Sequence, residues 1–182
     1  MKNIHTLLLL FILATTTVLA QPKEQVKVKW YTFEDAIELN KTNPKKIFID
    51  VYTDWCSWCK VMDNKTFSNP EIAQYLNTHF YPVKFNAEST EPITFQGIKF
   101  ENKQQGRRST HELAVALLQG KLSYPSVAYM DEESRLLTAV PGYYPAAKME
   151  PILKYFGGDH YKTTAWDEFS KSFIGVIKDE EE

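Results

Sequence analysis

The two cysteines of the 182-residue chain, Cys56 and Cys59, stand three positions apart in the segment DVYTDWCSWCK, and a tryptophan precedes each of them. Residues 45–53, just before the pair, form a run of β-branched and aromatic side chains that is typical of a buried strand. The pair therefore lies where a buried strand meets the next element. Cysteines at this spacing form a redox pair, half of a metal site or a small structural bridge.

Loop length and ligand count weaken the last two of these alternatives. A bridge between the two cysteines closes a loop of about four residues, which the loop-entropy relation values at about 2 kcal/mol, against about 4–5 kcal/mol for a long loop. A structural zinc site needs four ligands. Beyond the cysteines, the chain after residue 20 offers only the distant His79, His111 and His160. We therefore expect no metal and no cofactor.

The N-terminus has the features of a signal peptide, predicted over residues 1–20. A positive charge at Lys2 precedes the short apolar run of residues 6–13, and small residues lead to Ala20 at the presumed cleavage point. The run is shorter than the roughly 20 residues of a spanning helix, and an uncleaved membrane anchor is the less favoured alternative. We predict a periplasmic or secreted protein in an oxidising compartment, with its main domain over residues 21–158.

The net charge of the chain indicates which kinds of partner it can bind. The formal net charge is −2 and no long basic run occurs, which argues against nucleic acid as a partner. The one arginine pair, Arg107-Arg108, is interpreted as part of a solvated loop. We expect a monomer whose partners are proteins.

Hydrophobic periodicity and turn residues predict an α/β fold. Strands are predicted over residues 26–31, 45–53, 81–88, 126–131 and 135–140. Helices are predicted over residues 33–43 (capped by Thr32), 59–67, 70–80, 109–121 and 146–157. This order predicts a central mixed β-sheet flanked by helices, in which a strand–helix–strand unit gives a parallel pair and a last antiparallel hairpin closes the sheet.

The middle of the chain departs from this alternation. Over residues 88–120 the pattern predicts an insertion, made of a hairpin that turns at Gln96-Gly97 and a helix capped by Ser109 or Thr110. The insertion is longer than a simple sheet connection requires. We interpret it as a lid or groove wall that selects the partner.

The C-terminal part is predicted to be helical. Pro151 is expected to kink or restart the helix that follows Pro145. Residues 159–182 form a predicted helical appendix with an acidic tail that frays. Its apolar stripe consists of Trp166, Phe169, Phe173 and Val176.

The segment around the cysteines resembles the active-site stretch of the thioredoxin-like superfamily, in which a strand acid, a tryptophan, Cys-x-x-Cys and a lysine follow one another. Asp50 stands six residues before Cys56, where thioredoxins have a buried aspartate. Lys84, in YPVKFNAE, matches the lysine that faces that aspartate. Tyr124-Pro125 matches the family's cis-proline. Two segments, DWCSWCKVMDNKTFSNPEI and HELAVALLQGKLSYPSVAYMD, look closest to exported proteins of the thioredoxin-7 type.

The resemblance implies a thioredoxin-like fold and an exported thiol–disulfide oxidoreductase that acts on protein thiols and disulfides. Only a thiolate is a good nucleophile, and a helix N-terminus favours the anion, so Cys56 is expected to be the nucleophile and Cys59 the resolving thiol. Asp50, whose pKa desolvation should raise, is the expected proton acceptor. Lys84 is expected to moderate that shift.

Trp55, Trp58, Tyr124 and Pro125 are the expected substrate contacts, with the backbone of Tyr124 available to an extended substrate strand. Plainer alternatives are core packing for Trp55 and a loop aromatic for Trp58. The corresponding alternatives are a solvent-facing strand acid for Asp50, a surface strand lysine for Lys84 and a trans turn proline for Pro125.

The alternative function is a non-catalytic thioredoxin-like binding module with an inert disulfide. The residues between the cysteines are Ser57-Trp58, where thioredoxin usually has Gly-Pro. The direction of electron flow is therefore open, and a membrane-linked reductant is a partner that the resemblance implies.

Overall fold

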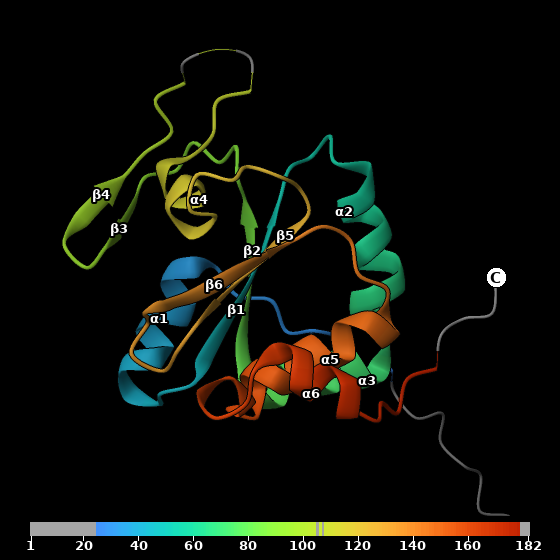
Figure 1. Cartoon of the computed structure of the whole chain (residues 1–182). Coiled ribbons are helices and arrows are strands. Elements are labelled where there is room, and N and C mark those ends of the chain that lie inside the picture. Colours follow the sequence, from blue (N-terminus) through green and yellow to red (C-terminus); the bar gives the residue numbers. More distant parts are fainter. Residues whose placement is uncertain (1–24, 105, 107, 179–182) are drawn as a thin grey trace, which may run out of the picture.

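The computed structural model of the chain describes residues 25–178 except 105 and 107. Its centre is a sheet with helices on both faces (Figure 1). The predicted signal peptide and the end of the predicted acidic tail, residues 179–182, lie outside the described residues.

The sheet has four strands in the order β2-β1-β5-β6. The strands are β1 (Lys46–Tyr52), β2 (Phe80–Asn86), β5 (Ser126–Met130) and β6 (Leu136–Pro141). β1 is parallel to β2 and antiparallel to β5, and β5 and β6 form an antiparallel hairpin. The predicted mixed sheet, with a parallel pair and a closing hairpin, is confirmed.

The helices form two layers. They are α1 (Phe33–Thr42), α2 (Ser57–Met62), α3 (Pro70–His79), α4 (Glu112–Leu117), α5 (Ala146–Gly157) and α6 (Trp166–Ser172), with a π-helical turn η1 (Asp63–Phe67) and a 3-10 turn η2 (His160–Lys162). Residues of α1 and α4 pack in one hydrophobic cluster. Residues of α2, α3 and α5 pack in the other.

The alternation of side chains along β1 decides which face each residue meets. Ile47, Ile49 and Val51 lie in the cluster with α1 and α4. Phe48 lies in the cluster with α2, α3 and α5. Asp50 has the parity of Phe48, so the strand directs it toward the layer that contains the cysteine helix.

The insertion lies between β2 and β5. It contains the hairpin of β3 (Ile93–Phe95) and β4 (Ile98–Phe100), which stands away from the sheet (Figure 1), and then α4. Gln96 and Gly97 form the turn with positive φ angles of 50° and 77°, the conformation that a two-residue hairpin turn requires. The hairpin and helix ahead of the cis Tyr124–Pro125 peptide bond are as predicted.

The predicted strand over residues 26–31 is wrong. Within that segment only Tyr31 pairs with the sheet, as an isolated bridge to Val83. The side chain of Asn77 on α3 accepts a hydrogen bond from the N–H of Lys29 and donates one to the carbonyl of Lys27, both at 2.8 Å. These bonds hold the segment against α3 and use backbone groups that a strand would need.

Two helix details also differ from the prediction. The cap of α4 is His111, whose Nδ1 accepts the N–H of Leu113 at 3.1 Å, rather than Ser109 or Thr110. α5 does not restart at Pro151 but runs through it from Ala146 to Gly157. No helix of the described residues is long and apolar enough to cross a membrane.

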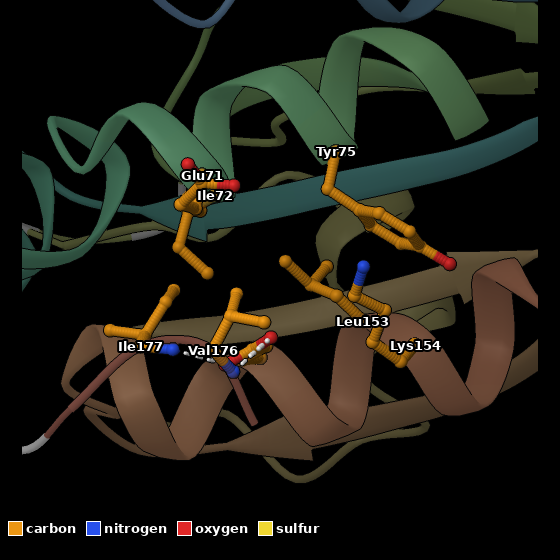
Figure 2. Close-up of a pocket in the computed structure, with 8 residues that line it drawn as sticks. Glu71, Ile72, Tyr75, Leu153, Lys154, Val176 and Ile177 are labelled. Atoms are coloured by element: carbon orange, nitrogen blue, oxygen red, sulfur yellow. Dashed lines mark hydrogen bonds between the residues drawn. The ribbon is translucent and has the colours of Figure 1, made fainter. Parts of the chain in front are cut away.

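The C-terminal segment is held to the body by a buried carboxylate. Glu150 on α5 is 3% exposed and accepts the backbone N–H groups of Val176 and Ile177 at 3.0–3.1 Å. Figure 2 shows the two residues lining a pocket with Ile72 of α3 and Leu153 of α5. α6 ends at Ser172, so the helical stripe does not continue to Val176. The side chain of Val176 is largely exposed, whereas Ile177 packs on the core.

We expect Glu150→Ala to release this C-terminal segment and to destabilise the oxidised protein by about 1–3 kcal/mol, because two backbone N–H groups lose their charged, buried acceptor. Urea unfolding and limited proteolysis after α6 measure the two effects. Glu150→Gln keeps one acceptor oxygen, so its free energy of unfolding should lie between those of Glu150→Ala and the wild type. An Ala variant that unfolds at the wild-type urea concentration contradicts the anchoring role.

Candidate active site

The cysteine pair lies at the end of β1 and the start of α2. Cys56 is the N-cap of α2, and its Sγ accepts the N–H of Cys59 at 3.1 Å. The two cysteines form a disulfide and are 3% and 2% exposed. α2 continues directly into η1, so the helical run that begins after Cys56 extends over residues 57–67.

Asp50 and Lys84 are direct neighbours across β1 and β2. Lys84 Nζ lies 2.5 Å from Asp50 Oδ2. Asp50 is 1% exposed, which excludes a solvent-facing strand acid. Its other carboxylate oxygen, Oδ1, has no hydrogen-bond partner among the described residues and is therefore free to meet a proton or a water molecule.

The electrostatics at Asp50 favour a proton acceptor. Burial raises its pKa to about 6; the Lys84 ammonium acts against this rise, and the charge of Asp63 adds to it. Rings surround the ammonium at 5.0–5.4 Å, from Trp30, Tyr52 and Phe67. A carboxyl group that titrates near neutrality can take up and release a proton under working conditions.

Asp63, the first residue of η1, is a residue that the sequence interpretation missed. It forms a second ion pair with Lys84, so one ammonium serves two carboxylates. Asp63 follows Cys59 by four residues, and residues at that spacing share a helix face. That spacing was the available signal. The partner on β2 could not be found without the sheet register.

An open groove of about 290 Å³ includes Trp58, the residue before Cys59, and is otherwise lined by Tyr124, Pro125, Gly142 and Tyr143. Trp58 is 59% exposed, and its ring lies 5.2 Å from that of Tyr143, which the sequence interpretation missed. The backbone N–H and C=O of Tyr124 have no hydrogen-bond partner within the described part of the chain. The groove thus joins aromatic surface to free backbone groups.

Trp55 does not pack in the core, since it is 47% exposed. Its Nε1 donates to Glu88 Oε1 at 2.9 Å, and its ring meets Tyr124 edge-on at 6.0 Å. The guanidinium of Arg108 lies 4.4 Å from the centre of the same ring. Arg108 lies in an exposed loop, as predicted, but its guanidinium also contacts Trp55, which the sequence interpretation missed; Arg107 lies outside the described residues. Among the described residues, no cluster of His, Cys, Asp and Glu is placed to hold a metal ion.

A four-stranded mixed sheet between helices, with a disulfide at the start of a helix and a cis-proline nearby, defines a thioredoxin-like protein. The chain belongs to the family Thioredox_DsbH, described as a protein of unknown function, DUF255, which matches residues 12–143.

The curated relatives match over short segments. An uncharacterized protein of Caenorhabditis elegans is 36% identical over 67 residues, which are 36% of this chain and 9% of that protein. The thiol:disulfide interchange protein DsbD of Haemophilus influenzae is 36% identical over 82 residues, which are 42% of this chain and 14% of DsbD. The chain thus covers only a small share of the length of these relatives.

Solved structures share the fold. The structure named DsbH Oxidoreductase matches with a TM-score of 0.54 and 18% identity, over 77% of this chain and 92% of the other. A thioredoxin from Thermus thermophilus matches with a TM-score of 0.52 and 14% identity, over 70% and 85%. The thioredoxin-like fold predicted from the sequence is confirmed.

Proposed function

We propose that the protein is an exported thiol–disulfide oxidoreductase that exchanges disulfides with protein substrates. The observation that carries this proposal is the Cys56–Cys59 disulfide at the start of α2, in a fold that places the buried Asp50 on the adjoining strand. The similarity to a thiol:disulfide interchange protein supports the same class of activity.

In the reducing direction, the Cys56 thiolate attacks one sulfur of the substrate disulfide. A mixed disulfide forms, and the first substrate thiolate leaves. Cys59 then attacks the Cys56 sulfur, and its proton passes to Asp50, directly or through water. The second substrate thiolate leaves, so two electrons have moved to the substrate and the Cys56–Cys59 disulfide remains. In the oxidising direction the same steps run in reverse.

The groove supports binding of an extended substrate segment. The unpaired backbone groups of Tyr124 offer one donor and one acceptor, as in strand addition. Trp58 and Pro125 add apolar surface beside them. A dithiol partner, by resemblance a membrane-linked reductant, would restore the thiols of Cys56 and Cys59.

The remaining organisation belongs to the same proposal. Residues 1–20 are the cleaved signal peptide, residues 21–158 the thioredoxin-like domain and residues 159–182 an appendix. The mature protein is a periplasmic or secreted monomer that needs no cofactor.

The reduction potential of the Cys56–Cys59 pair tests this function. We expect equilibration with glutathione or dithiothreitol buffers to give a value above about −300 mV, since structural disulfides lie below it. Purified reduced protein should also reduce insulin. A lower potential without insulin reduction supports the alternative, a binding module with an inert disulfide. The near-complete burial of both cysteines favours that alternative.

A further inference from the structure

Trp55, which immediately precedes the proposed nucleophile, is held on three sides. Glu88 accepts its indole N–H at 2.9 Å, Arg108 stacks on its ring at 4.4 Å, and Tyr124 meets it edge-on at 6.0 Å. Glu88 and Arg108 both belong to the insertion, and Tyr124 lines the groove. The insertion therefore reaches the cysteine pair through one tryptophan side chain.

We propose that the insertion sets the choice of protein substrate by clamping Trp55, with Glu88 and Arg108 as positioning residues. The clamped indole extends the groove with an aromatic wall for an extended peptide segment that flanks the substrate disulfide. This inference rests on the proposed function and adds to it the part of the chain that selects the substrate.

The base of the insertion is fixed by a buried amide. Asn102 is 9% exposed, and its Nδ2 donates to the carbonyl oxygens of Glu88, at 3.2 Å, and of Ser109, at 2.8 Å. These two residues start and end the excursion that contains the β3–β4 hairpin. Because Ser109 adjoins Arg108, one side chain fixes the spacing between the two sides of the clamp.

A second buried side chain attaches the insertion to the domain. His111 is fully buried, and its backbone N–H donates to the carbonyl of Ala87 at 2.7 Å. Its Nε2 lies 3.0 Å from the carbonyl of Glu91, while its Nδ1 caps α4. The clamp is therefore mounted on a hydrogen-bonded base that continues directly from β2.

The chemistry of the two positioning residues suits an indole. The Arg108 side chain has no carboxylate partner among the residues described, so its charge is available to the ring face. A planar guanidinium stacks on aromatic faces in a way that a lysine ammonium does not. The charged acceptor of Glu88 fixes the rotation of the indole within its plane. Together the two contacts restrain an exposed side chain that would otherwise adopt several rotamers.

The test compares insulin with hydroxyethyl disulfide, a small disulfide without peptide flanks. Single-turnover oxidation of the reduced protein gives a maximal rate and a half-saturating insulin concentration for each variant. We expect Arg108→Ala and Glu88→Ala each to raise the half-saturating insulin concentration about fivefold, which is the ratio expected for the loss of one such exposed contact. The maximal rate should be retained. The rate constant with hydroxyethyl disulfide should change less than that with insulin.

Conservative variants separate clamping from general packing. Arg108→Lys keeps the charge without the planar stack and should have the same half-saturating insulin concentration as Arg108→Ala. Glu88→Gln keeps an acceptor for the indole N–H, so its half-saturating concentration should equal that of the wild type. Lys99→Ala removes an insertion cation that pairs with Glu101 and is the matched control. Thermal unfolding verifies that each variant folds.

The outcomes distinguish the two proposals. Wild-type insulin reduction with unchanged half-saturation in Arg108→Ala and Glu88→Ala overturns the clamp alone. A wild type that reduces neither disulfide overturns the proposed function, and the clamp with it. A higher half-saturating concentration in both Ala variants, with Lys99→Ala like the wild type, supports the clamp.

Discussion

Cys56→Ser is expected to lower insulin reduction by about a thousandfold or more, the scale of loss seen when a nucleophile is removed. A serine hydroxyl is not ionised near neutral pH and cannot form a disulfide with the substrate. Cys56 is the cysteine at the helix N-terminus, where free N–H groups favour the anion. Insulin turbidity with dithiothreitol as the reductant, corrected for the uncatalysed rate, measures the effect.

Cys59→Ser provides the matched control, because it keeps the nucleophile and removes the resolving thiol. It should accumulate a mixed disulfide with insulin, visible as a band on a non-reducing gel that disappears on reduction. Cys56→Ser should form no such band. If Cys56→Ser retains insulin reduction, or if only Cys56→Ser forms the mixed disulfide, the assignment of the two roles is wrong.

Much of the fold could be predicted because its signals are local. The β-branched run before Cys56 became β1, Asn69 caps the helix that begins at Pro70, and Gln96-Gly97 turns the β3–β4 hairpin. Each of these features depends on residues a few positions apart. The segment over residues 26–31 failed because its backbone groups bond to a side chain on α3, which is distant in the sequence.

The contacts of the candidate site were harder to predict than the fold, because they join residues that are distant in the sequence. The pairing of Asp50 with Lys84 was available only through the family resemblance, because 34 residues separate them in the sequence. The only local signal for Asp63 is its four-residue spacing from Cys59, and Tyr143 has none; the roles of both depend on their contacts with Lys84 and Trp58. The stacking of Arg108 on Trp55 required the folded insertion, since the arginine pair alone resembles any solvated basic dipeptide.

Asp50→Asn is expected to slow resolution of the mixed disulfide by about a hundredfold at neutral pH, the lower end of the range for a lost acid–base group. Burial raises the pKa of Asp50 to about 6. In the wild type, the rate should therefore rise as pH increases through about 6, because only the ionised carboxylate accepts the Cys59 proton. Asp50→Asn should lack this rise. Rapid mixing of trapped mixed disulfide at stepped pH values measures it.

Stability gives a second readout of the same group. Because folding raises the pKa of Asp50 from 3.8 to about 6, its protonated form is favoured in the folded state. The stability that it contributes is fully present below about pH 4 and is lost as pH rises through about 6, a change of about 3 kcal/mol. Urea unfolding of the oxidised protein should show this loss in the wild type and not in Asp50→Asn. If the free energy of unfolding changes with pH to the same extent in the wild type and in Asp50→Asn, the pKa assigned to Asp50 is wrong.

In Asp63→Asn, the rate of mixed-disulfide resolution should still rise with pH, but the rise should occur at a lower pH than in the wild type. The charge of Asp63 raises the pKa of Asp50, and its ion pair competes for Lys84. Removing that charge leaves the ammonium to Asp50 alone, so the carboxylate ionises more easily and accepts the Cys59 proton at lower pH. Asp54→Asn is the control, because Asp54 bonds to Asn86 and not to Lys84. If Asp63→Asn follows the wild-type profile, the shared ammonium has no part in proton transfer.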